Sequence, residues 1–151
     1  MSKVAKRRAL IVHGMSAVSA VAMSASLMVP PAWSAADPST TFLNEGFNWC
    51  DAVLIGAYWG MGASEAKAGA GQKIIDRGKD GKKAVKQIIK EGRKVAQCQW
   101  EDTGHSFEEA ELLGAYWSIS TGDAKAKVAR LFTDGDSDKV AKAIKKASKG
   151  G

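Results

Sequence analysis

The chain has 151 residues, with 22 Lys and Arg against 16 Asp and Glu, and a formal net charge of +6. Four of the basic residues and none of the acidic residues lie in the first 36 positions, so residues 37–151 contain 18 basic and 16 acidic residues, a net charge of +2. This small charge argues against a general nucleic-acid-binding protein. The 115 residues from 37 to 151 fit one domain with a buried core.

Residues 1–36 have the three parts of an export signal: a basic start, an apolar stretch from Ala9 to Val29, and the small-residue end "PPAWSAA". We predict cleavage after Ala36, with cleavage after Ser34 as the alternative. An uncleaved membrane anchor is the competing interpretation, but polar residues dilute the apolar stretch and two prolines close it. The mature chain is therefore predicted to be periplasmic or extracellular, with no transmembrane span.

The segment "LIGAYWG" at 54–60 returns 58 residues later as "LLGAYWS" at 112–118. Matching residues flank both copies, which indicates an internal duplication. We predict two repeat units, at about 48–95 and 106–148, each made of three helices. Because no segment shows the alternation of a strand, the predicted fold class is all-α, a small helical domain.

Both units begin with residues that cap helices. Asn48 precedes Asp51 by three positions, and Ser106 precedes Glu109 in the same way, which is the spacing of a capping box. The apolar residues that follow have helical spacing, and we predict that they form a pseudo-symmetric core. The predicted repeat core consists of Ala52, Ile55, Gly56, Tyr58, Trp59, Ala110, Leu113, Gly114, Tyr116 and Trp117.

Gly56 and Gly114 lie in mid-helix, where glycine costs about 1 kcal/mol relative to alanine. We expect close approach of the two helices to compensate for this cost. The Tyr-Trp pair that follows each glycine has an alternative role as a platform on which a ligand stacks. Aromatic residues at helical spacing usually pack in a core, which is the interpretation we favour.

The second helices are expected to start near Ser64 and Ser120, and the third helices to span 82–97 and 138–147. The third helix of the first unit has basic residues opposite an apolar face, and a weaker lysine-rich copy ends the chain. A solvated face is the plain interpretation, and contact with anionic lipid, polysaccharide or nucleic acid is the alternative. This candidate binding surface consists of Lys82, Lys83, Lys86, Lys90, Arg93 and Lys94.

The two cysteines are Cys50, at the start of the first helix, and Cys98, just before the second unit. Two cysteines in an exported chain are expected to form a disulfide. Metal binding is the alternative, but His105 is the only histidine after residue 36 and no Cys-x-x-Cys spacing occurs. The segment "DGDSD" at 134–138 begins like a calcium loop but continues with lysine where that loop needs glycine, so we expect it to cap the last helix. No metal and no cofactor are predicted.

A family resemblance involves the two cysteines. The chain has "NWC" at the start of its first helix, a second cysteine 48 residues later at the end of a basic helix, and a lysine-rich C-terminus. In these features it resembles the periplasmic acid-stress chaperones of the HdeA type. The resemblance covers Trp49, Cys50, Cys98 and the order of the helices between them, and it implies chaperone activity.

Three functional classes follow from these patterns. We favour an exported, non-enzymatic protein that binds another macromolecule, with a stress chaperone as the version that the resemblance implies. The alternative is a binder of anionic surfaces that uses the lysine-striped helix. An enzyme with a site around Asp102, His105 and Ser106 is the third class, but no catalytic motif accompanies these neighbours.

Overall fold

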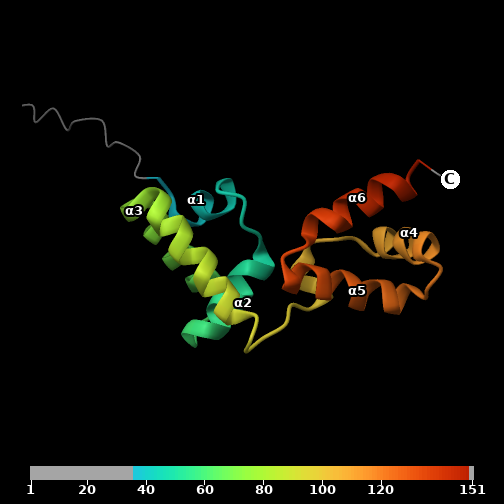
Figure 1. Ribbon diagram of the computed structural model, residues 1–151, viewed down its shortest axis with the longest axis horizontal. Helices are drawn as coiled ribbons and strands as arrows, with labels where there is room; N and C mark the ends of the chain where they lie inside the picture. The colour runs from blue at the N-terminus through green and yellow to red at the C-terminus, as the bar shows by residue number, and fades with distance from the viewer. Residues whose placement is uncertain (1–35, 150–151) are drawn as a thin grey trace, which may run out of the picture. The chain divides into compact units, whose positions relative to one another are not determined.

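The computed structural model describes residues 36–149, so all but the last residue of the predicted export signal lies outside the described part. This part is all-helical and has no strand, which confirms the predicted fold class. None of its helices is long and apolar enough to cross a membrane. In chain order (Figure 1) the elements are α1 (Pro38–Asn44), α2 (Trp49–Trp59), α3 (Ala63–Gly92), the 3-10 helix η1 (Trp100–Thr103), α4 (Phe107–Trp117), α5 (Thr121–Asp134) and α6 (Ser137–Ala147).

Helix α1 has no counterpart among the expected elements. Its N-cap residue Asp37 accepts a hydrogen bond from the backbone N–H of Thr40 at 2.7 Å, and Pro38 occupies the first position of the helix, where a missing N–H is tolerated. Phe42 is fully buried and stacks on Phe47, with 5.0 Å between the ring centroids. Because α1 packs on α3, Phe42 anchors this short helix to the core.

The starts of α2 and α4 agree with the prediction. The side chain of Asn48 accepts from the N–H of Asp51 at 2.9 Å, and the Asp51 carboxylate accepts from the N–H of Asn48 at 3.0 Å. Ser106 and Glu109 form the same reciprocal pair, at 3.3 and 2.9 Å. Each box satisfies two N–H groups of the first turn. Both helices have eleven residues, so the matched segments share their local structure, while the duplication stays a prediction.

The two mid-helix glycines do not bring α2 and α4 together. Within residues 36–149, no Cα atom of α2 lies within 8 Å of one in α4, so the expected close approach is wrong. A Cβ on Gly56 would instead lie 2.7 Å from the carbonyl oxygen of Met61, and one on Gly114 would lie 3.1 Å from that of Ile119. Each glycine therefore makes room for the chain that turns back after its own helix. Helix α2 packs mainly on α3, and α4 on α5 and α6.

Element α3 covers the two helices that we expected after α2 in the first unit, joined across a kink. The kink lies at Gly78, between the two expected helices, where a φ of 53° and a ψ of −124° are not helical and suit a residue without a Cβ. The helix ends at Gly92 and not at Gln97, where we expected its end. At Gly92 it passes so close to the backbone of Leu54 that no Cβ would fit. The residues after α3 form a turn and then a short segment without regular structure that contains Cys98.

Helices α5 and α6 begin close to the predicted positions. Ser120 accepts from the N–H of Asp123 at 3.0 Å and so caps α5. Asp136 is the N-cap residue of α6, but its side chain forms no cap hydrogen bond and instead pairs with Lys139 at 2.7 Å. All six α-helices of residues 36–149 contribute to the buried core. Its largest fully buried side chains are Phe42, Leu54, Ile55, Val85, Leu113, Val128 and Val140.

Candidate binding site

The predicted basic surface lies on the second half of α3, and its members form two groups. In the described part of the chain, no carboxylate oxygen lies within 4.0 Å of the basic groups of Lys86, Lys90 and Arg93. The other members have acidic neighbours: Lys82 with Glu45 at 2.8 Å, Lys83 with Asp80 at 3.8 Å, and Lys94 with Glu91 at 2.6 Å.

Lys86, Lys90 and Arg93 line a cleft of about 430 Å³, which we call the basic cleft. Phe47 and Ile89 add apolar surface to it. The loop between α1 and α2, the start of α2 and the turn between α5 and α6 complete its lining. The fold therefore places the three members of the predicted basic surface that have no carboxylate within 4.0 Å in the described part of the chain around one hollow.

Asp51 is the acidic residue that lines the basic cleft. Burial raises the pKa of its carboxyl group, and the hydrogen bond from the Asn48 N–H and the nearby Arg93 guanidinium oppose that shift. Since the carboxylate also belongs to the capping box of α2, its position is fixed. On acidification Asp51 becomes neutral earlier than an ordinary aspartate, which increases the net positive charge of the cleft.

Arg93 extends from the end of α3 to the turn between α5 and α6. Its guanidinium lies against Gly135, where φ is 84° and a Cβ would overlap the arginine. The Nε atom is buried and has no hydrogen-bond partner among the described residues. A guanidinium presents its donors in a plane that suits carboxylate, phosphate or sulfate groups. Arg93 is therefore the best anion-recognition group in the basic cleft.

The predicted repeat core is only partly buried. Tyr58 and Tyr116 are 49% and 44% exposed, so their assignment to the core is wrong. Trp59 and Trp117 are half-buried against the core. Each Tyr-Trp pair lies in the last turn of its helix, where the tryptophan packs against the core and the tyrosine faces solvent. The buried members are Ala52, Ile55, Gly56, Ala110, Leu113 and Gly114.

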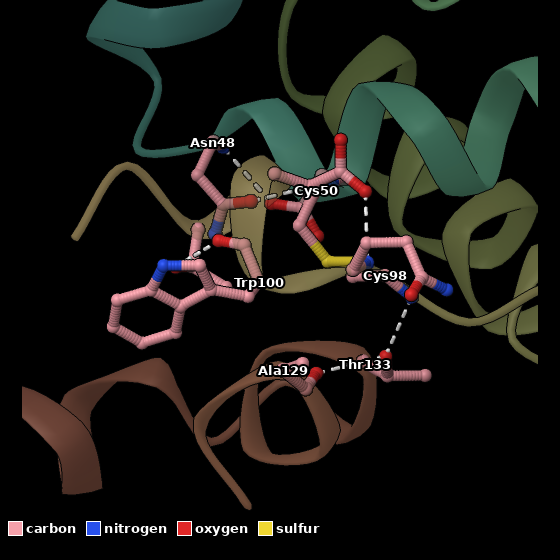
Figure 2. The surroundings of a disulfide bond; sticks show 10 residues. Asn48, Cys50, Cys98, Trp100, Ala129 and Thr133 are labelled. Atoms are coloured by element: carbon pink, nitrogen blue, oxygen red, sulfur yellow. Dashed lines mark hydrogen bonds between the residues drawn. A yellow bond between two sulfur atoms is a disulfide. The ribbon is translucent and has the colours of Figure 1, made fainter. Parts of the chain in front are cut away.

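Figure 2 shows the disulfide between Cys50, in the first turn of α2, and Cys98, which confirms the predicted pair. The hydroxyl of Thr133 in α5 accepts from the Cys98 N–H at 2.9 Å and donates to the Ala129 carbonyl at 3.0 Å. Both cysteines are buried. The bond therefore holds the segment around Cys98 between α2 and α5, which is a structural role.

Asp102, His105 and Ser106 are each engaged at the start of a helix. Asp102 accepts from the Gln99 N–H at 2.8 Å, at the start of η1. Ser106 caps α4, and the His105 Nδ1 lies 3.0 Å from the carboxylate of Glu109 in the same capping box. No hydrogen bond joins the three side chains to one another in residues 36–149, so they do not form a triad there. The described residues also contain no group of three or more His, Cys, Asp and Glu that could hold a metal ion.

Sequence reasoning identified the cations of the basic cleft but not its other walls. Asn48 and Asp51 are recognisable as a capping box, and Phe47 as an apolar residue before it. Nothing local indicates that these residues face Lys86 and Lys90, more than 30 positions later. Only the packing of α2 on α3 brings the two segments together.

Comparisons of the chain with protein-family models, with curated proteins and with solved structures found no match.

Proposed function

We propose that this chain is an exported, non-enzymatic protein that binds another macromolecule by its anionic groups, which enter the basic cleft. The main support is that Lys86, Lys90 and Arg93 line one hollow and have no carboxylate within 4.0 Å in the described part of the chain. A buried disulfide is compatible with export into an oxidising compartment.

The chemistry of the basic cleft favours a partner with repeated anionic groups. A single exposed ion pair contributes about 0.2–1 kcal/mol, so one anion bound by one lysine has little affinity. A polymer can place several anionic groups against Lys86, Lys90 and Arg93 in the cleft at the same time. Because these contacts are exposed, added salt is expected to weaken binding strongly. Lowered pH is expected to strengthen it, since protonation of Asp51 removes the opposing charge.

Titration of the mature chain with dextran sulfate at low and high salt, and at neutral and lowered pH, tests this proposal. The sulfate groups of this polymer stay charged at every pH used, so any effect of pH on binding comes from the protein. The double variant Lys86→Gln/Lys90→Gln removes two cations of the cleft and leaves Arg93 in its packed position. We expect it to bind about tenfold more weakly at low salt.

The matched control is Lys79→Gln/Lys83→Gln, which removes the same charge from the same helix outside the cleft. We expect about a twofold loss from this general change of charge. Equal losses in the two variants would show that the partner senses net charge alone, and the basic cleft would then have no special role.

A second candidate function, acid-triggered binding of client proteins, is favoured by the hydrogen bonds at the helix starts. A carboxylate accepts a hydrogen bond at the beginning of five different elements; these residues are Asp37, Asp51, Asp102, Glu109 and Asp123. Hydrogen bonds at the helix starts lower the pKa of Asp37 and Glu109, so protonation of these two carboxylates weakens their caps. As the carboxylates become neutral, the positive charge of the 18 basic residues of the mature chain is less opposed. The helices would then loosen and expose apolar surface.

This second candidate is tested by lowering the pH from 7 to about 3 while recording the binding of a hydrophobic dye and the aggregation of a client protein. Dye binding together with protection of the client supports a chaperone of the acid-stress type. An unchanged circular dichroism spectrum without dye binding at the lowest pH contradicts it, and it leaves the proposal for the basic cleft unaffected.

A further inference from the structure

A second hollow, separate from the basic cleft, lies where α4, α5 and α6 pack together. Its volume is about 330 Å³, and we call it the aromatic groove. Trp117, Leu131 and Ala143 supply apolar walls, and Tyr116 lines it with a ring that is 44% exposed. The groove therefore offers apolar surface that the rest of the described chain does not cover.

Four lysines also line the aromatic groove: Lys127 on α5 and Lys139, Lys142 and Lys146 on α6. Lys139 and Lys142 form ion pairs with aspartates near the start of α6, at 2.7 and 2.9 Å. Among the described residues, no carboxylate oxygen lies within 4.0 Å of Lys127 or Lys146. No acidic residue lines the groove, so two positive charges beside it lack a counter-charge.

Lys127 has a defined position before any ligand binds. Its ammonium group lies 4.1 Å from the centroid of the Trp117 ring, a cation–π contact. This contact leaves the charge of the lysine uncompensated, because the ring is neutral. The contact favours one position of the exposed lysine side chain, so less side-chain entropy is lost when a ligand binds.

The size and charge of the aromatic groove define the class of its ligand. A water molecule occupies about 30 Å³ in the liquid, and a chain carbon with its hydrogens is of similar size. A volume of 330 Å³ therefore corresponds to about ten chain carbons. We propose that the groove binds a free single-chain carboxylate, with its head near Lys127 and Lys146 and about ten chain carbons against Trp117, Leu131 and Ala143. A free chain can fill this hollow completely, whereas a lipid within a bilayer keeps its chains in the membrane.

Isothermal titration calorimetry of the mature chain with decanoate and hexanoate tests the proposal. Each buried CH₂ is expected to increase affinity up to about fourfold, so decanoate should bind at least about tenfold more tightly than hexanoate in this open groove. Lys127→Gln and Lys146→Gln should each weaken decanoate binding about two- to fivefold. Lys145→Gln removes the same charge from the neighbouring position of α6, which does not line the groove, and should leave binding unchanged.

Several results would overturn the proposal. Acetate binding as tightly as decanoate would remove the role of the apolar walls, and decyltrimethylammonium binding as tightly would remove the role of the lysines. Equal losses of decanoate affinity in Lys145→Gln and Lys146→Gln would show that the carboxylate binds outside the groove. Binding to anionic vesicles without binding of decanoate would indicate a contact with a membrane instead of a free ligand. The Lys86→Gln/Lys90→Gln variant should bind decanoate normally, so the aromatic groove and the basic cleft are tested independently.

Discussion

Replacing Gly71 by alanine tests whether α1 packs on α3 as the structure places it. A Cβ at this position would overlap the backbone carbonyl group of Pro38, in the first turn of α1. Backbone atoms cannot rotate away as a side chain can, so α1 would have to move as a unit. Phe42, which is fully buried, would then lose part of its contacts with the core.

Two opposing free-energy terms determine the size of this effect. Alanine is about 1 kcal/mol more favourable than glycine in a helix interior. Overpacking costs about 1–3 kcal/mol, and partial release of a buried phenylalanine adds about 1 kcal/mol. We therefore expect Gly71→Ala to lower the free energy of unfolding by about 1–3 kcal/mol.

Urea unfolding followed by circular dichroism measures this change, and the same helix supplies a control. At Gly69, two positions earlier, a Cβ would meet the Trp59 ring at 3.4 Å, which is an ordinary contact. Gly69→Ala is thus expected to raise the free energy of unfolding by about 0.5–1 kcal/mol. The two variants should change stability in opposite directions. Equal stabilisation by both would refute the close packing of α1 on α3.

Loss of the disulfide in Cys50→Ser/Cys98→Ser is expected to lower the free energy of unfolding by up to about 4 kcal/mol in urea titrations, because the bond joins residues 48 positions apart. A backbone hydrogen bond at the start of α4 lowers the pKa of Glu109. The ionised Glu109 therefore stabilises the fold at pH values above the ordinary pKa of a glutamate, and this stabilisation is lost as the pH falls through the lowered pKa. Glu109→Gln should therefore flatten the fall of stability between pH 7 and about 3 in urea titrations. Burial raises the pKa of Asp51, so ionisation of the folded state costs stability as the pH rises through that pKa. Asp51→Asn should therefore equal the wild type in stability at low pH and be more stable than the wild type at pH 7, as measured by urea unfolding. A less stable variant at pH 7 would show that the Arg93 guanidinium affects the Asp51 pKa more strongly than burial does.

The sequence was sufficient for features that depend on neighbouring residues. The starts of α2 and α4 follow from Asn48 and Ser106, each of which has an acidic residue three positions later to complete a capping box. The pairing of Cys50 with Cys98 follows from the number of cysteines and the expected compartment. Neither prediction needs the arrangement of the helices.

Features that depend on distant segments were not predictable in the same way. The start of α1 has a recognisable cap at Asp37, but only its burial of Phe42 against the core makes so short a helix stable. The stripe on α3 predicts six equivalent cations, whereas Glu45, Asp80 and Glu91 pair with three of them. The aromatic groove combines Lys127 of α5 with the last helix and the end of α4, which only the tertiary packing brings together.

The glycines of the repeated "GAYW" segment have a local explanation. The N–H of Met61 donates to the carbonyl of Gly56 at 2.9 Å, and the N–H of Ile119 donates to that of Gly114 at the same distance. In both places the residue just after the helix is left-handed, which gives the 6→1 hydrogen bond of a Schellman motif. The chain then returns over the glycine so closely that a side chain would press on the turn.

This geometry changes what the repetition says about the molecule. If the glycine were present in both segments because the two helices touch, the two segments would have to be in contact. A glycine that is required by the turn at the end of a helix implies only that both helices end at the same point of the segment. At each helix end the tyrosine is exposed and the tryptophan is half-buried beside a lysine. The ammonium group of Lys73 lies 6.0 Å from the centroid of the Trp59 ring, and that of Lys127 lies 4.1 Å from the centroid of the Trp117 ring. The second of these ends lines the aromatic groove because α6 passes beside it. The same short segment can therefore end a helix in both places and line the aromatic groove, the proposed ligand site, in only one, because α6 packs next to the second copy.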